Sequence, residues 1–549
     1  MCRVDDSTEE TRLLENEDHH VDNVSQENGH SHQNDGQGTD NVPLTRQAST
    51  RELLAVLAAT WVGLFFAALD ATIIATLTTP ISSEFRSLSL LSWLVSAYLI
   101  ANAACQPVAG KLTDIFSRRN GLIFSNVLFG TGCLICGLAR NEWVMITGRV
   151  VSGIGGGGLT AISTFVSSDL VPLRTRGIWQ GYGNVVFGLG LSLGGVVGGW
   201  LNDALGWRWA FLLQVPFTVV SGLLVAFLVD IPAKETRESA WKRVDYRGAV
   251  LLTLSLVLLL LGLNTGGNQF PWNHPLVITA LLLSMVFILL FVYVEDKIAP
   301  EPIIPVRLLL RRTVWAACFT NVFSTMSFFI VFFYIPLYLQ ISGHSATQAG
   351  LRLIPQAFAI SMGSIGAGLV MRITGRYYLM DCISMTIFIA GAALICTLNF
   401  SAPDWQTYVY PVPGGFGYGS MLTITLVALI AAVDHKHQAV ITSASYAFRS
   451  IGSTVGVTIG SAVFQNWLYR SLMQAFDKVP HKDRLVRRIR DDYHEITRLY
   501  SSTLRQKALA CYMEAFRATF LTALAITILA GLTSLFMKEH KLHTNLARN

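Results

Sequence analysis

The sequence predicts an all-α polytopic membrane protein, and three observations lead to this fold class. Hydrophobic residues make up 52% of the 549 residues and charged residues only 14%, whereas soluble domains carry about 25% charged residues. From Leu53 onward the chain is a series of apolar runs, each about 18–25 residues long, which is the length of a helix that crosses a bilayer. The period-two alternation of a membrane β-barrel is absent. Since no water satisfies the backbone inside the bilayer, these runs are predicted to be helices.

The apolar runs divide the chain into about fourteen predicted spans. In chain order they cover residues 53–79, 91–110, 120–139, 143–167, 177–199, 208–229, 247–264, 275–294, 314–340, 346–371, 377–397, 407–432, 439–465 and 517–537. The seventh span is the shortest, and the tenth is interrupted early by Arg352 and Pro355.

Lysine and arginine residues in the short loops set the orientation, because positively charged short loops stay in the cytosol. With the N-terminus in the cytosol, the cytosolic loops are rich in both residues, from Lys111 in the first to Lys436 in the last. The opposite short loops hold about three such residues, Arg86, Arg140 and Arg208. Both termini are therefore expected in the cytosol. The pI near 8.8 reflects this topology and does not indicate a nucleic-acid partner.

Two long polar segments flank or interrupt the spans. Residues 1–50 are predicted to be a disordered cytosolic tail, and the polar start argues against a signal peptide. Its histidines have no structured ligand spacing, so no metal site is predicted. Residues 466–516 form a basic segment on the lumenal side, part of which is a candidate amphipathic surface helix.

Segments eight spans apart repeat one pattern. Residues 184–201, NVVFGLGLSLGGVVGGWL, and 446–468, YAFRSIGSTVGVTIGSAVFQNWL, both read as glycine-punctuated helices that end near a tryptophan. GIGGGG at 153–158 has a counterpart in GGFGYG at 414–419. The chain is therefore predicted to contain two six-helix units, a pattern typical of secondary transporters, which bind substrate between the units.

This repeat gives the predicted domains. They are a cytosolic tail (1–50), an N-terminal six-helix bundle (51–232), a linker with two extra spans (233–312), a C-terminal six-helix bundle that includes the lumenal loop 466–516 (313–540), and a cytosolic C-terminus (541–549).

Four motifs then occur in order. They are LDATIIATLTTPI (69–81), GKLTDIFSRRN (110–120), GRVVSGIGGGG (148–158) and GLGLSLGGVVGGWL (188–201). With these motifs the chain resembles the fourteen-span drug:proton antiporter branch of the major facilitator superfamily, and within it most closely the fungal vacuolar basic amino acid transporters. The resemblance covers about residues 50–540. It implies a major facilitator fold of two six-helix bundles plus two inserted helices, driven by a proton gradient.

Asp70 lies in the middle of the first span. A carboxylate at membrane depth marks an ion or substrate path, and desolvation favours its protonated form. We predict that Asp70 binds the proton and a cationic substrate in turn; the alternative is a hydrogen bond that only packs helices. The resemblance implies a role in proton coupling for Arg149. The alternative is that the Arg149 side chain extends to the outer membrane interface, since Glu142 and Trp143 begin this helix only two turns earlier.

The loop after the second span is a conformational motif in the family that the chain resembles. Gly110 permits close packing, and Asp114 can interact with the positive end of a facing helix and with Arg118 or Arg119. A loop whose basic residues only set topology is the alternative, but it does not explain Asp114.

GIGGGG matches the G-x-G-x-x-G pattern of dinucleotide loops, but such a loop needs a preceding strand. Here the glycines lie inside an apolar helical run, with Gly153, Gly156 and Gly157 near one face, where they allow neighbouring helices to pack and slide. The fifth span carries a second set of predicted packing glycines, Gly188, Gly194, Gly195, Gly198 and Gly199. Cys133 and Cys136, also within an apolar run, are interpreted as packing residues rather than a redox pair.

Polar side chains inside the spans form a candidate substrate cavity. They are Asn102, Gln106, Asn184, Asn321 and Gln356. Taken singly, each is more often a hydrogen bond between helices than a substrate contact.

The N-terminal tail contains a candidate sorting signal. Glu9 is followed, after three residues, by Leu13 and Leu14, which fits an acidic dileucine signal. A sorting adaptor can reach it in a cytosolic tail, so we expect a vacuolar, lysosome-like membrane.

We therefore expect a proton-coupled transporter that moves basic amino acids (Lys, Arg and His) from the cytosol into the vacuole. A plasma-membrane multidrug exporter with the same coupling is the main alternative, and a transporter-like nutrient sensor is a third. No Walker sequence or catalytic constellation is present, so an enzyme is not expected. The expected partners are the lipid bilayer, protons and a small cationic substrate, with no cofactor, no metal and no nucleic acid, and we expect a monomer.

Overall fold

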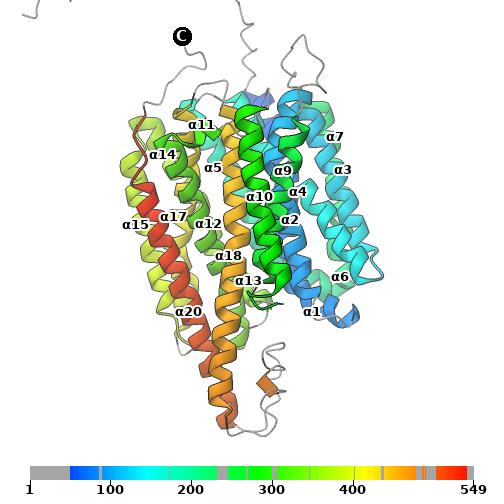
Figure 1. Cartoon of the computed structure of the whole chain (residues 1–549), viewed down its shortest axis with the longest axis vertical. Helices are drawn as coiled ribbons and strands as arrows, with labels where there is room; N and C mark the ends of the chain where they lie inside the picture. Colours follow the sequence, from blue (N-terminus) through cyan, green and yellow to red (C-terminus); the bar gives the residue numbers. More distant parts are fainter. Residues whose placement is uncertain are drawn as a thin grey trace, which may run out of the picture. The chain divides into compact units, whose positions relative to one another are not determined.

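The computed structural model describes residues 50–85, 90–171, 173–230, 245–266, 270–298, 306–344, 346–400, 402–433, 438–477, 485–486, 489 and 502–540. Almost all of these residues are helical, and a single bridge between Gly266 and Phe270 is the one β pairing among them. The predicted tail and its sorting signal lie outside the described residues, apart from Thr50. Figure 1 shows that the long helices run side by side.

The first predicted bundle is built from seven helices. They are α1 (Thr50–Phe85), α2 (Leu90–Phe116), α3 (Arg118–Gly137), α4 (Glu142–Leu170), α5 (Leu173–Leu205), α6 (Trp207–Leu212) and α7 (Gln214–Leu228). Asn141 caps α4 by accepting a hydrogen bond from the Val144 amide at 2.9 Å, which fixes where this helix begins. The sixth predicted span consists of α6 and α7 together.

The remaining helices follow the predicted linker and second bundle. They are α9 (Tyr246–Thr265), α10 (Pro275–Lys297), α11 (Val306–Leu309), α12 (Arg312–Ile341), α13 (Ala346–Leu351), α14 (Ile354–Thr374), α15 (Tyr378–Cys396), α16 (Asp404–Val409), α17 (Pro411–Ala431), α18 (Gln438–Ala475) and α20 (Ser502–Ser534). The tenth span is broken where Arg352 and Pro355 predicted an interruption, since α13 ends at Leu351 and α14 begins at Ile354.

In the described part of the chain, 12 helical segments are long and apolar enough to cross a membrane. α2 and α18, the second and thirteenth predicted spans, are not among them. Asn102 and Gln106 in α2, and Arg449 with several serines and threonines in α18, lower the apolar content of these helices. The count of fourteen spans therefore stays a prediction.

The polar segment 466–516 contains more regular helix than we expected. α18 continues to Ala475 and α20 begins at Ser502, so both helices extend into the segment. Ser471 on α18 donates a hydrogen bond to Glu514 on α20 at 2.8 Å, while Leu472 and Phe476 are fully buried. These helices are stabilised by packing on each other, so they do not end where the apolar run ends.

Glycines spaced four residues apart bring two helix pairs into close contact. A Cβ atom at Gly190 would lie 2.6 Å from the Phe65 carbonyl oxygen on α1. On α18, Cβ atoms at Gly452 and Gly456 would lie 2.5 Å from the carbonyl oxygens of Val322 and Met326 on α12. Both pairs therefore pack backbone against backbone. This shared arrangement agrees with the sequence repeat, although the domain boundaries derived from the repeat remain a prediction.

The two predicted bundles contact each other mainly along two helix pairs. α5 packs on α14, and α2 packs on α18. These contacts bring together segments that lie far apart in the sequence, and within the bundles α5 also packs on α1 and α18 on α12. The candidate site lies among these helices.

Candidate functional site

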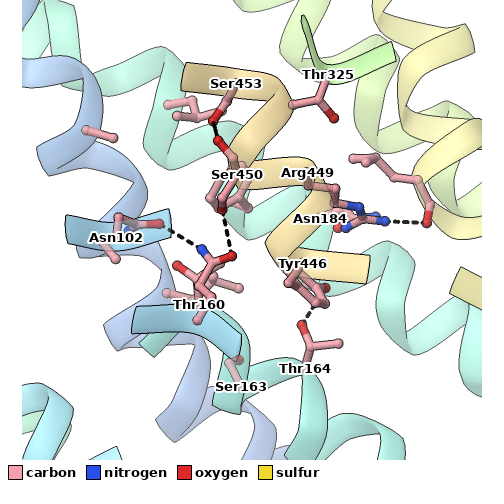
Figure 2. Close-up of a pocket in the computed structure, with 18 of the residues that line it drawn as sticks. Asn102, Thr160, Ser163, Thr164, Asn184, Thr325, Tyr446, Arg449, Ser450 and Ser453 are labelled. Carbon is pink, nitrogen blue, oxygen red and sulfur yellow. Dashed lines mark hydrogen bonds between the residues drawn. The ribbon is translucent and has the colours of Figure 1, made fainter. Parts of the chain in front are cut away.

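A pocket lies between the two predicted bundles. Its lining comes from α1, α2, α4 and α5 of the first bundle and from α12, α17 and α18 of the second. Figure 2 shows labelled side chains from helices of both bundles around it. The polar lining residues are Tyr98, Asn102, Gln106, Thr160, Ser163, Thr164, Ser167, Gln180, Asn184, Thr325, Tyr418, Tyr446, Arg449, Ser450 and Ser453. The pocket thus has the position that alternating access requires, at the boundary between the repeats.

Three of the five predicted cavity residues line this pocket, namely Asn102, Gln106 and Asn184. Asn321 and Gln356 are buried and are not among the residues that line it, so a substrate contact for these two stays a prediction. The Gln356 side chain lies next to α17, since a Cβ atom at Gly415 would be 3.0 Å from its Cγ atom. Each of the two sits on a helix face turned toward other helices, which the sequence did not reveal.

Neutral hydrogen bonds connect the bundles across the pocket. The Gln106 amide nitrogen donates to Asn102 Oδ1 at 2.7 Å, and Gln106 Oε1 accepts from the Ser450 hydroxyl at 2.6 Å. The Thr164 and Tyr446 hydroxyl oxygens are 2.6 Å apart (Figure 2). Such side chains can exchange partners with a substrate or water, so the contacts need not lock the bundles together.

Arg449 is the residue of this pocket that our sequence reasoning missed. Its Nε donates to Asn321 Oδ1 at 3.1 Å and its Nη2 to the Leu422 carbonyl oxygen at 2.7 Å. The guanidinium carbon lies 4.9 Å from the Tyr446 ring centroid. The signal was present in the sequence, since an arginine inside a predicted span is a functional candidate by the argument applied to Asp70.

Asp70 and Arg149 form a fully buried ion pair. Arg149 Nη1 lies 2.7 Å from Asp70 Oδ2, and both side chains are 0% exposed. Arg149 Nε also donates to the Leu94 carbonyl oxygen at 3.0 Å. The guanidinium carbon lies 4.4 Å from the Tyr98 ring centroid. The alternative that Arg149 extends to the outer interface is therefore wrong, because a carboxylate and a ring hold it inside.

Tyr98 lies between this ion pair and the pocket. It lines the pocket, its ring contacts Arg149, and its hydroxyl donates to the Ala67 carbonyl oxygen at 2.8 Å. Asp70 itself does not line the pocket. The geometry therefore does not show the direct contact of Asp70 with substrate that we expected. The Asp70 carboxylate pairs with Arg149, and Tyr98 lies between this pair and the pocket.

In the loop motif, Arg118, the first residue of α3, contacts two other helices, α2 and α4. Its Nε lies 2.9 Å from Asp169 Oδ2 at the end of α4, and its Nη1 donates to Thr113 Oγ1 at 2.7 Å and to the Gly110 carbonyl oxygen at 3.4 Å. We expected Asp114 as the acidic partner, and the Asp114 side chain lies outside the described residues. Asp169, near the end of α4, supplies a carboxylate here. Arg119 is half-buried beside it.

At the same predicted cytosolic side, Arg176 connects the bundles. Its Nη1 donates to Gln438 Oε1 on α18 at 3.4 Å and its Nη2 to the Val171 carbonyl oxygen at 3.2 Å. Burial lowers the pKa of Arg176 to about 10. The side chain therefore remains a cation at neutral pH.

The glycines of GIGGGG face two neighbouring helices from inside the continuous helix α4. Cβ atoms at Gly153 and Gly157 would lie 2.6 Å from the carbonyl oxygens of Tyr98 and Asn102 on α2, and one at Gly156 would lie 2.5 Å from the Tyr98 hydroxyl oxygen. Gly155 and Gly158 face α3 instead. The strand-turn-helix that a dinucleotide loop requires is not formed here.

The α5 glycines fall into two classes. A Cβ atom at Gly198 would lie 2.9 Å from the Ile73 carbonyl oxygen, and one at Gly194 2.6 Å from that of Leu69. At Gly188 and Gly195 the nearest atoms would be 3.8 and 3.7 Å away, an ordinary contact. Gly195 thus faces Thr76 of α1 and Gly188 faces Ala357 of α14 with room for a Cβ atom, so these two positions do not require glycine. Gly199 is half-buried in the same helix.

Known proteins share this sequence pattern over most of the chain. The family model described as Major Facilitator Superfamily matches residues 60–457. Multidrug resistance protein fnx1 of Schizosaccharomyces pombe is 37% identical over 500 residues, which cover 90% of this chain and 94% of that protein. Vacuolar membrane amino acid uptake transporter fnx2 of the same organism is 36% identical, covering 91% and 86%. Vacuolar basic amino acid transporter 2 of Saccharomyces cerevisiae is 33% identical, covering 69% and 82%.

Proposed function

Because this chain is a member of the Major Facilitator Superfamily of membrane transporters, we propose that it is a proton-coupled antiporter. In this proposal it moves basic amino acids (Lys, Arg and His) from the cytosol into the vacuole by alternating access. α2 and α18, which pack among the 12 candidate spans, would then also cross the membrane and complete fourteen spans.

One observation carries the proposal, namely the polar pocket whose lining is shared by both bundles, with a buried ion pair directly behind it. A pocket at the boundary between repeats can face either side as the bundles rock. The names of two relatives, a vacuolar amino acid uptake transporter and a vacuolar basic amino acid transporter, support the substrate and the membrane.

Proton coupling is proposed to act through Tyr98. A proton from the acidic lumen neutralises Asp70, so Arg149 loses its charged partner. Arg149 then retains its contacts with the Leu94 carbonyl oxygen and the Tyr98 ring. A buried arginine cannot be left without compensation, so its guanidinium shifts and moves Tyr98, which lines the pocket. Proton and substrate thus affect each other without sharing one carboxylate. The motif contact between Arg118 and Asp169 is proposed to hold one facing state, and the α4 glycines to let the helices slide.

Uptake into vacuolar vesicles tests this function. Vesicles from cells that express the protein should accumulate labelled Lys, Arg and His, and a protonophore should abolish the accumulation, because the proton gradient is the driving force. Vesicles from cells that lack the protein are the control. Uptake that is unchanged by the protonophore would reject proton coupling. Absence of uptake of all three amino acids would reject the substrate assignment.

A multidrug exporter is the second candidate, favoured by the similarity to Multidrug resistance protein fnx1. In that case the protein should lie in the plasma membrane and lower the cellular content of cationic dyes, with no effect on vacuolar amino acids. Dye retention and amino acid content, measured in the same cells with and without the protein, separate the two candidates.

The predicted sorting signal gives a test of location. Replacing Leu13→Ala together with Leu14→Ala should move a fluorescent fusion from the vacuolar membrane to the plasma membrane, because an adaptor would no longer bind the tail. Val21→Ala together with Val24→Ala is the matched control in the same tail. An unchanged location of the Leu13 and Leu14 variant would remove the role assigned to Glu9, Leu13 and Leu14.

A further inference from the structure

Of the described residues that line the pocket, Arg449 is the one with a charged side chain. It is 8% exposed and lies in the first half of α18. A positive charge therefore lines a pocket that is proposed to receive basic substrates. This is unexpected on electrostatic grounds, because two cations repel each other strongly where water is scarce.

The charge of Arg449 is not neutralised by a described carboxylate. Arg149 and Arg118 differ in this respect, since Arg149 pairs with Asp70 and Arg118 with Asp169. Arg176 also donates its hydrogen bonds to neutral groups, but it lies at the predicted cytosolic end of α5 and does not line the pocket. The recorded partners of Arg449 are the Asn321 amide oxygen, the Leu422 carbonyl oxygen and the Tyr446 ring. All three are neutral. A buried arginine whose partners are all neutral keeps an uncompensated positive charge, which an anion would stabilise.

The guanidinium is also held in place. Asn321, which accepts from Arg449, itself donates to Ser445 Oγ at 3.3 Å and accepts from Thr425 Oγ1 at 3.1 Å. These contacts use the N–H of Nε and one N–H of Nη2 of Arg449, so both N–H groups of Nη1 and the second N–H of Nη2 are left to a ligand. Arginine presents its donors in a rigid fork that matches the two oxygens of a carboxylate. Asn321 thus acts as a positioning residue.

We propose that Arg449 binds the carboxylate of the transported substrate, so that the pocket selects molecules with a free carboxylate group. This inference rests on the proposed transport of amino acids and specifies how they are recognised. The cationic end of the substrate has no described carboxylate in the pocket, but it has aromatic rings such as Trp61 and Trp179. Such rings attract cations. A basic amino acid therefore fits, whereas a diamine of the same length does not.

The test compares lysine with two analogues in the vesicle uptake assay. Lysinamide keeps the side chain and replaces the carboxylate by an amide, and cadaverine lacks the group altogether. With the natural protein, both analogues should compete with labelled lysine at least about tenfold more weakly than lysine does, the discrimination typical of one good ionic contact. A merely structural role of Arg449 predicts no such difference.

Variants then assign the effect to Arg449. Arg449→Gln should raise the KM for lysine at least about tenfold and bring the ratio of lysine to lysinamide competition close to one. Arg449→Lys should recover part of the discrimination, since it restores the charge but not the fork. Arg470→Gln makes the same change at an exposed position of α18 and should leave the ratio unaltered.

The outcomes separate this inference from the proposed function. Lysine uptake with equally strong competition by lysinamide would overturn the inference and leave the function standing. The same holds if Arg449→Gln takes up less lysine but still discriminates as the natural protein does. Absence of amino acid uptake by the natural protein would reject the function and this inference together. If Arg449→Gln fails to reach the membrane, the inference is still tested by the ratio of lysine to lysinamide competition, measured for the natural protein and for Arg449→Lys.

Discussion

Asp70→Asn should abolish proton-driven uptake and destabilise the folded protein by about 3–5 kcal/mol, the usual effect of removing one partner from a buried ion pair. Asp70 and Arg149 are both 0% exposed and 2.7 Å apart, so the substitution leaves a buried guanidinium without a carboxylate. Thermal unfolding of the purified protein measures the destabilisation, and uptake with and without a protonophore measures the loss of proton-driven transport.

The double variant Asp70→Asn with Arg149→Gln separates stability from coupling. Removing both charges should restore most of the stability, because no uncompensated charge remains in the interior. Proton-driven uptake should stay lost, since the group that is proposed to bind the proton is gone. If Asp70→Asn alone retained full uptake with an unaltered pH profile, the proposed coupling through this pair would have to be abandoned.

Gly194→Ala should reduce abundance and uptake several-fold, whereas Gly195→Ala should have little effect. A Cβ atom at Gly194 would lie 2.6 Å from the Leu69 carbonyl oxygen and 3.0 Å from the Ile73 amide nitrogen. Both are backbone atoms of α1 that cannot rotate away, so α1 and α5 would have to separate. We expect a destabilisation of about 1–3 kcal/mol, as for other overpacked sites.

The neighbouring Gly195 serves as the control on the same helix. Its Cβ atom would lie 3.7 Å from Thr76 Cγ2, an ordinary contact, so alanine fits. Fluorescence-detected size-exclusion of tagged variants reports the amount of folded protein, and uptake per folded molecule reports function. Equal effects of the two substitutions would contradict the close approach of α1 and α5. Because Leu69 adjoins Asp70, a loss of uptake per molecule at Gly194 would also link this packing to the ion pair.

The helical membrane architecture and the approximate extent of the helices could be predicted from the sequence alone. The predicted spans 120–139, 143–167 and 377–397 correspond to α3 (Arg118–Gly137), α4 (Glu142–Leu170) and α15 (Tyr378–Cys396). This succeeded because a backbone without water must form its hydrogen bonds within each segment, so length and apolarity along the chain are sufficient. Helix ends that lie beyond the apolar runs, such as Ala475 of α18, were not predicted, because packing between helices rather than apolarity sets them.

The contacts between side chains could not be predicted from the sequence and became clear from the three-dimensional structure. In the structure, Asp70 pairs with Arg149, and Arg118 pairs with Asp169. Glycine is required at Gly194 but not at Gly195. Arg449 lines the pocket, whereas Asn321 does not. The physical reason is that lipid and protein interior are both apolar. The hydrophobic pattern therefore places a helix in the membrane but does not fix its rotation about its own axis. That rotation comes from the fit of small residues and polar groups against neighbouring helices, and the candidate site depends on it.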